Sequence, residues 1–270
     1  MQDKIIPAKV LSIAGSDPSG GAGIQADIKT VTSLGGYAAA AMTALTIQNT
    51  EGVRGVFPVP SATVAEQIAA VMEDIEPQAV KIGMVNDADI VRVISEAIVR
   101  YAPRYVVFDP VMVSTSGHRL IGENVAARLE SDLIPRATII TPNMSEAEVL
   151  WRRPIDSVES MEQAAEELAR RYGTAVLVKG GHLDGDKMCD ILCDGRETHR
   201  FTAERIATRN LHGTGCTLSS AIATLLAQGR NMYDAVAEAK RYVSRAIEAG
   251  SRMAIGRGNG PLWHGVGKER

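Results

Sequence analysis

Short apolar runs alternate along the chain with longer stretches whose apolar residues recur at helical spacing. Several of the short runs carry no polar alternation, which is typical of strands covered on both faces. We predict strands at residues 9–14, 40–47, 79–82, 105–109, 138–141 and 175–179. Helical patterns lie between or after them, at residues 24–34, 62–74, 87–100, 125–132, 161–172, 217–228 and 232–253. This alternation predicts an α/β fold with a mainly parallel sheet and right-handed crossovers.

A different pattern follows the last of these strands. Residues 188–193 and 197–201 are typical of two strands joined by the turn Asp194-Gly195-Arg196, which predicts a hairpin at an antiparallel edge of the sheet. No linker, internal repeat or shift in composition divides the chain, so residues 1–270 are expected to form a single domain. In open sheets of this class, ligands bind beyond the carboxyl ends of the strands.

Composition narrows the class of protein. Hydrophobic residues make up 45% of the 270 residues, which is enough for a large core. The net charge of −3, without a basic stripe, argues against nucleic acid and anionic membranes as partners. Three cysteines without a CxxC pair, and five histidines without metal-ligand spacing, predict a reduced, cytoplasmic protein. Residues 1–7 do not resemble a secretion signal, and no apolar run is long enough to span a membrane.

A glycine-rich loop at residues 15–23 follows the first predicted strand. Within it, Gly21 to Ala26 fits the dinucleotide-binding pattern GxGxxG/A, which leaves a nicotinamide or flavin enzyme as one alternative. Two features oppose that alternative: six residues separate Ala14 from Gly21, and the second strand ends in Gln48-Asn49 rather than in an acid. The chain contains neither GxxxxGK[ST] nor GxSxG, which argues against P-loop NTPases and serine hydrolases of the elbow type.

The run His212-Gly213-Thr214-Gly215-Cys216 precedes the predicted helix at 217–228. Two glycines allow a tight turn with inward N–H groups, and the helix adds the positive end of its dipole. The run is therefore a candidate anion seat, able to neutralise charge on a phosphoryl group in transfer, with a thiol at its centre. The alternative is an ordinary helix start with a buried cysteine.

Other candidate groups follow the ends of predicted strands. The carboxamide of Gln48 has a donor beside an acceptor, which complements the edge of an aminopyrimidine, although a solvated loop amide is the alternative. Asp109 and Glu146 are either helix-capping groups or hard-oxygen ligands for Mg²⁺, often through water. Lys179, beside Gly180-Gly181, either meets a nucleotide phosphate or faces solvent.

Taken together, these segments resemble the hydroxymethylpyrimidine and phosphomethylpyrimidine kinases of thiamine synthesis, in the ribokinase superfamily, over nearly the whole chain. The resemblance implies a ribokinase-like three-layer α/β/α sandwich with a mostly parallel central sheet. It also implies a cytoplasmic homodimer that uses ATP and Mg²⁺. The γ-phosphoryl group would be transferred first to 4-amino-5-hydroxymethyl-2-methylpyrimidine and then to its monophosphate.

The same resemblance assigns roles to particular residues. The catalytic glycine motif matches Gly213, Thr214, Gly215 and Cys216. The pyrimidine pocket matches Gln48 and Asp27, with Gly15, Met84 and Val111. The ATP and phosphate region matches Lys179, Asn143 and His212, and the metal region matches Glu146 and, through water, Asp109.

Cys216 stands where many relatives in the superfamily carry an aspartate as the presumed base. A thiol has an ordinary pKa of about 8.5, and a helix N-terminus with nearby cations would lower it, so a thiolate base is one expectation. The other is that Cys216 only helps to form the anion seat, because a thiolate would repel a phosphoryl group.

Two alternatives in function stay open. Pyridoxal kinases share the scaffold, and some phosphomethylpyrimidine kinases accept pyridoxal through a cysteine pair, one in the glycine motif and one in a flap. Residues 113–117, where the flap is expected, contain no cysteine, which weakens this reading. A protein that only binds the pyrimidine conflicts with a full set of phosphate-handling residues.

Overall fold

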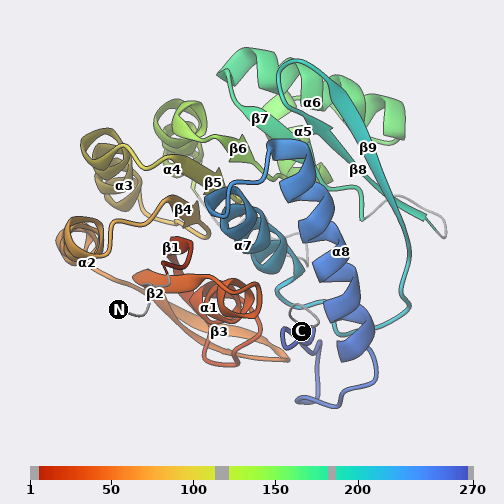
Figure 1. Ribbon diagram of the computed structural model, residues 1–270, viewed down its shortest axis with the longest axis horizontal. Helices are drawn as coiled ribbons and strands as arrows, with labels where there is room; N and C mark the ends of the chain where they lie inside the picture. The colour runs from red at the N-terminus through yellow and green to blue at the C-terminus, as the bar shows by residue number, and fades with distance from the viewer. Residues whose placement is uncertain (1–5, 113–121, 182–186, 267–270) are drawn as a thin grey trace, which may run out of the picture.

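The computed structural model describes residues 6–112, 122–181 and 187–266. In these ranges the chain forms one sheet of nine strands in the order β3-β2-β1-β4-β5-β6-β7-β8-β9 (Figure 1). The strands are β1 (Lys9–Ser16), β2 (Tyr37–Asn49), β3 (Gly52–Pro58), β4 (Ala79–Ile82), β5 (Tyr105–Phe108), β6 (Ile139–Ile140), β7 (Ala175–Val178), β8 (Lys187–Cys193) and β9 (Thr198–Glu204). The six central strands, β2, β1, β4, β5, β6 and β7, are parallel. The strands β3, β8 and β9 pair antiparallel at the two edges.

Helices cover both faces of the sheet, so the molecule has three layers. The helices are α1 (Gly23–Ser33), α2 (Ser61–Asp74), α3 (Ala88–Tyr101), α4 (Glu123–Arg128), α5 (Met144–Trp151), α6 (Val158–Tyr172), α7 (Thr214–Ala227) and α8 (Met232–Gly250). One apolar cluster joins the sheet to α2, α3, α4, α5 and α6, and a second joins its other face to α1, α7 and α8. The mainly parallel α/β architecture expected from the sequence is confirmed.

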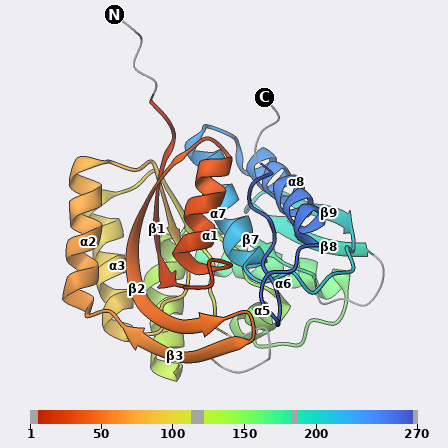
Figure 2. The ribbon, with the colours of Figure 1, turned by 90° about the horizontal axis from the view of Figure 1, so that it is seen from below.

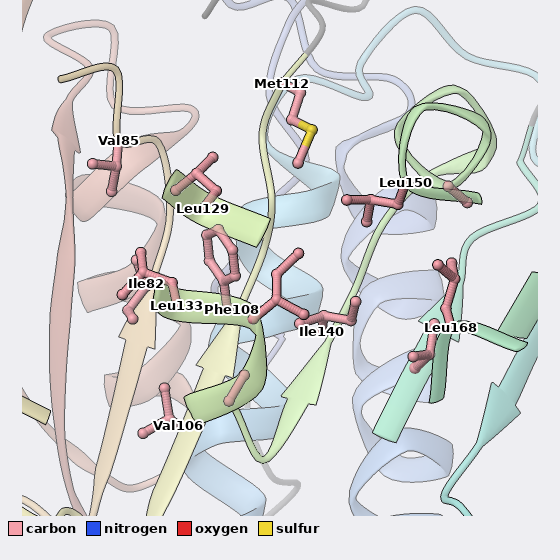
Figure 3. Packing of buried hydrophobic residues seen from close by; sticks show 14 of the residues in the cluster. Ile82, Val85, Val106, Phe108, Met112, Leu129, Leu133, Ile140, Leu150 and Leu168 are labelled. Carbon is pink, nitrogen blue, oxygen red and sulfur yellow. The ribbon is translucent and has the colours of Figure 1, made fainter. Parts of the chain in front are cut away.

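The central strands are short and buried on both faces, which explains their unbroken apolar sequences. Phe108 at the end of β5 is 1% exposed. Figure 3 shows it packed beside Ile82 of β4 and Leu133, which lies in a turn of π-helix, Leu129–Leu133, after α4. This packing fixes the carboxyl ends of β4 and β5, from which candidate site residues emerge.

The edges of the sheet differ in how far they could be predicted. The antiparallel hairpin β8–β9 is confirmed. By contrast, β3 was not expected, because its side chains are nearly all exposed and show no alternation of buried and exposed positions. The strand expected at 40–47 is longer, since β2 continues into a hairpin with β3 (Figure 2).

Three helical features also depart from the expectation. The helix expected at 125–132 is α4, continued by the π-helical turn. The helix α5 is absent from the predicted ranges, and only the helix-capping alternative for Glu146 points to it. The helix expected to begin at residue 217 begins at Thr214, so that Cys216 lies inside its first turn. The predicted flap, residues 113–117, falls outside the described residues.

Candidate active site

The loop between β1 and α1 closes around the buried carboxylate of Asp17. This carboxylate accepts hydrogen bonds from the Ser19 amide at 2.9 Å, the Ser19 hydroxyl at 2.7 Å and the Ala22 amide at 2.9 Å. Its Oδ2 also lies 2.8 Å from Nε2 of His212. Burial alone would raise the pKa of Asp17, but the hydrogen bonds from His212 and Ser19 lower it to about 2. Asp17 is therefore ionised at neutral pH and ties the glycine-rich loop to the segment before α7.

The α7 N-terminus faces this loop, and its two glycines have different functions. Gly213 is left-handed, with φ of +86°, and a side chain there would collide with the Gly21 backbone. Gly215 is helical, and a Cβ atom there would lie 3.3 Å from both Asp109 Oδ2 and Lys179 Nζ. The expectation that both glycines form the turn is wrong: Gly213 turns the chain, and Gly215 lets the helix approach a charged pair.

That pair lies at the carboxyl ends of β5 and β7. Lys179 Nζ is 2.8 Å from Asp109 Oδ1, which also accepts a hydrogen bond of 3.0 Å from the Thr141 hydroxyl. Burial alone would lower the pKa of Lys179, but the carboxylates of Asp109 and Glu146 raise it. The lysine therefore keeps its positive charge beside the first turn of α7.

Asn143 and Glu146 form a capping box at the start of α5. The Glu146 amide donates to Asn143 Oδ1 at 2.9 Å, and the Asn143 amide donates to Glu146 Oε2 at 2.8 Å. Burial raises the pKa of Glu146 to about 7, with Lys179 opposing the rise and Asp109 adding to it. The described residues contain no group of three or more His, Cys, Asp or Glu side chains placed to hold a metal ion. Two carboxylates and an amide oxygen are hard ligands that suit Mg²⁺ when water and phosphate complete its shell.

Asp27 occupies a different setting from the one expected. Its side chain is fully buried, and its Oδ1 and Oδ2 lie 2.9 and 2.8 Å from Lys81 Nζ. The hydroxyls of Ser12 and Ser220 also donate to it, at 2.6 and 2.7 Å. Both carboxylate oxygens are engaged, so this geometry gives Asp27 a structural role and does not support direct contact with a pyrimidine. Lys81, which sequence reasoning missed, joins β4 to α1 through this pair.

Cys216 lies in α7 one helical turn before Ser220, which donates to Asp27 of this buried pair. Burial raises the pKa of the Cys216 thiol, although the positive charge of Lys81 opposes the rise. The expectation that the helix end and nearby cations lower this pKa is therefore wrong, because desolvation outweighs them. At neutral pH Cys216 is a neutral thiol, which favours the anion-seat role over the base.

Of the predicted pyrimidine-side residues, Gly15, Gln48 and Met84 lie at the ends of β1, β2 and β4. Gly15 lies against Met84, since a Cβ atom on this glycine would be 2.8 Å from Met84 Cε. Gln48 Nε2 lies 3.2 Å from His212 Nε2. Val111 is half-buried and follows β5. His212, predicted at the ATP phosphates, is thus placed next to Gln48 instead; its contact with ATP stays a prediction.

His264 contacts the first turns of α7 through Thr217. Its ring is buried, with Nε2 3.0 Å from the hydroxyl of Thr217, and burial lowers its pKa to about 4 from an ordinary 6.5. As the pH falls from 6.5 to 4, the unfolded chain takes up this proton before the folded protein does, so stability present above pH 6.5 is lost. Between pH 7 and pH 4, the free energy of unfolding should therefore fall by about 2–3 kcal/mol less in His264→Gln than in the parent.

Urea unfolding at pH 7 and pH 4 measures how far the free energy of unfolding falls in His264→Gln and in the parent. Glu146 acts in the opposite direction over pH 4.5 to 7, because its raised pKa lets the folded state hold its proton longer. The comparison of variant with parent cancels that contribution. Equal losses in the two proteins would contradict a neutral, buried His264.

Within the described ranges, no helix has both the length and the hydrophobicity to cross a bilayer. The chain matches the family model described as phosphomethylpyrimidine kinase over residues 17–263. It is 49% identical over 255 residues to a thiamine biosynthesis bifunctional protein of Geobacter sulfurreducens, covering 94% of this chain and 52% of that relative, about half its length. It is 48% identical over 258 residues to a hydroxymethylpyrimidine/phosphomethylpyrimidine kinase of Rhizobium meliloti, covering 95% and 97% of the two chains.

Solved structures extend the similarity to the fold. A phosphomethylpyrimidine kinase from Clostridium difficile superposes with a TM-score of 0.80 at 44% identity, covering 88% of this chain and 99% of that one. An ADP complex of Bacillus subtilis pyridoxal kinase superposes with a TM-score of 0.89 at 34% identity, covering 96% and 98%.

Proposed function

The chain belongs to the phosphomethylpyrimidine kinase family, and from that premise we propose that it phosphorylates 4-amino-5-hydroxymethyl-2-methylpyrimidine and then its monophosphate, with ATP as donor. The product would be the pyrophosphate used in thiamine biosynthesis. The three-layer fold is the ribokinase-like fold of the kinases above. One observation carries the assignment of the transfer site: the ion pair of Asp109 and Lys179 lies against the first turn of α7.

The chemistry of each transfer sets what the site must do. An oxygen of the pyrimidine substrate, first of the hydroxymethyl group and then of the phosphate, bonds to the γ-phosphorus while the bond to the ADP oxygen breaks. In the first transfer the hydroxyl proton is released to water. The moving group carries negative charge throughout. Lys179 supplies a positive charge, and the first-turn amides of Gly215 and Cys216, which have no acceptor within the helix, supply aligned dipoles.

Mg²⁺, when bound to the ATP phosphates, would neutralise part of their charge. Glu146 and Asp109 would hold it, directly or through water, with Asn143 fixing the position of Glu146 through the capping box. One oxygen of each carboxylate is already hydrogen-bonded, so these side chains are oriented before a metal arrives.

Replacing Cys216 by serine tests the role of the thiol. If the thiolate were the base, its loss would lower kcat by about 10²–10⁴-fold. Burial raises the pKa of the Cys216 thiol, and the backbone amides remain in Cys216→Ser. We therefore expect kcat of the variant to stay within about tenfold of the parent, a much smaller fall than the removal of a general base would cause. Steady-state kinetics on the folded variant distinguishes the two roles of Cys216. Abolished turnover would show that the thiolate acts as the base.

The bifunctional activity is tested by stoichiometry. With excess ATP and limiting pyrimidine, two ADP should form for each pyrimidine consumed. One ADP per pyrimidine would confine the enzyme to the first transfer. ATP left unchanged would favour a protein that only binds the pyrimidine.

Pyridoxal kinase activity is the second candidate, and one observation favours it: the pyridoxal kinase structure superposes with the higher TM-score. Against it, the sequence at residues 113–117 provides no second cysteine to pair with Cys216. The primary reading therefore stays with the pyrimidine.

We infer a homodimer built on the β2–β3 hairpin. This hairpin exposes apolar side chains at Leu45, Ile47, Val53, Val56 and Phe57, each at least 40% accessible. Clustered exposed apolar groups of this kind mark interfaces. Sedimentation equilibrium should give twice the 28.8 kDa of the chain, and a monomer at micromolar concentration would contradict the inference.

A further inference from the structure

Three side chains form a continuous line from the glycine-rich loop to the pyrimidine side of the site. Asp17 Oδ2 lies 2.8 Å from His212 Nε2, which lies 3.2 Å from Nε2 of Gln48. At its other end, Gln48 Oε1 lies 3.2 Å from the hydroxyl of Thr46. The imidazole packs so closely on the loop that a Cβ atom on Gly21 would be 2.5 Å from its Cδ2.

The donors and acceptors of this line determine its hydrogen-bond directions. Asp17 is ionised and can only accept, so the proton between it and His212 resides on Nε2. That nitrogen then has no lone pair to accept from an amide N–H, and two donors face each other across 3.2 Å. The conflict disappears when the Gln48 carboxamide turns by half a revolution about its terminal bond, because Oε1 can then share the single Nε2 proton of His212 with Asp17 in a three-centre hydrogen bond.

The other end of the amide is compatible with either orientation. The single proton of the Thr46 hydroxyl can be donated to the Ser16 carbonyl at 2.9 Å or to Gln48 Oε1 at 3.2 Å. When it is donated to Ser16, Thr46 Oγ1 accepts from the amide nitrogen instead. His212 is therefore the group that selects the orientation with Oε1 toward His212 and Nε2 toward Thr46.

We propose that Asp17 and His212 determine substrate specificity by locking the Gln48 carboxamide in this single orientation. In it, Oε1 keeps one lone pair and Nε2 keeps one proton for a ligand. They match a ring edge with an amino donor beside a ring-nitrogen acceptor, whereas an oxo group beside a ring N–H presents the reverse order. The inference rests on the proposed function, in which Gln48 contacts the pyrimidine.

The test compares kcat/KM for two substrates, the 4-amino pyrimidine and its 4-oxo analogue, 5-hydroxymethyl-2-methylpyrimidin-4-one. We expect the parent to favour the amino substrate by about 10²-fold, since the oxo analogue meets the half-buried Gln48 amide with two mismatched hydrogen bonds. In His212→Phe and Asp17→Asn the amide is free to turn, and the preference should fall below about tenfold. Lys29→Met is the matched control, because Lys29 contacts the same loop at the Gly20 carbonyl without touching the line; it should keep the parent's preference.

Each outcome has a defined meaning. A general structural defect lowers both specificity constants together, so variants that are slower but keep the parent's ratio overturn the proposal. A control that loses the ratio as the variants do also overturns it. Failure of the parent to phosphorylate either pyrimidine would instead defeat the proposed function, and that result is distinguishable because it needs no variant.

Discussion

Replacing Lys81 by methionine should lower the free energy of unfolding by about 3–5 kcal/mol. Lys81 and Asp27 form an ion pair of 2.8 Å in which neither side chain has any exposed surface. Removing the ammonium leaves the carboxylate buried without a counter-charge, although the hydroxyls of Ser12 and Ser220 still donate to it. Urea unfolding monitored by circular dichroism measures the loss.

Two further variants isolate the ion pair as the cause. In Lys81→Met/Asp27→Asn no charge is left uncompensated, so the double variant should be more stable than the single Lys81→Met. Arg92→Met breaks an exposed pair with Glu96, in which the side chains are 44% and 63% accessible, and should change the free energy of unfolding by less than about 0.5 kcal/mol. A double variant less stable than Lys81→Met would contradict this explanation.

Replacing Lys179 by methionine should lower kcat by about 10²–10³-fold. The lysine keeps its charge between Asp109 and Glu146, and its Nζ lies beside the first turn of α7. Methionine has a similar length but cannot stabilise charge on the transferred group. Steady-state kinetics with saturating ATP measures the effect, because a transition-state contact lowers kcat and not only affinity.

The surface variant Arg92→Met serves here too as the control for loss of a positive charge, and it should turn over as the parent does. Circular dichroism must show that Lys179→Met is folded. A folded Lys179→Met with the parent's kcat would remove the Asp109–Lys179 pair from the mechanism.

Buried strands and amphipathic helices were predictable because their packing imposes a repeating pattern on the sequence. The strand at 79–82 was predicted with its observed ends, since every residue in it is buried. The exposed strand β3 has no such pattern and was missed. The helix α7 begins at Thr214 rather than at residue 217, because the left-handed backbone of Gly213 starts it. The sequence contains two nearby glycines and does not specify which of them adopts this conformation.

The candidate site was predictable in its members more than in its contacts. The order of the motifs predicted that Lys179, Asp109 and the glycine run of α7 share one site. It did not predict the direct ion pair between Lys179 and Asp109. Lys81 carried one usable signal, a lysine within an otherwise apolar strand. Asp17 carried a weaker one, an Asp-Pro-Ser-Gly turn. The pKa of the Cys216 thiol could not be predicted, because it depends on how burial compares with the charge of Lys81.

The most direct test of the central claim is a competition between the two candidate substrates. The protein is incubated with MgATP and equimolar 4-amino-5-hydroxymethyl-2-methylpyrimidine and pyridoxal, and the products are identified by mass. We predict that the pyrimidine gains two phosphoryl groups before pyridoxal is appreciably phosphorylated. Phosphorylated pyridoxal beside an unmodified pyrimidine would contradict the proposed function.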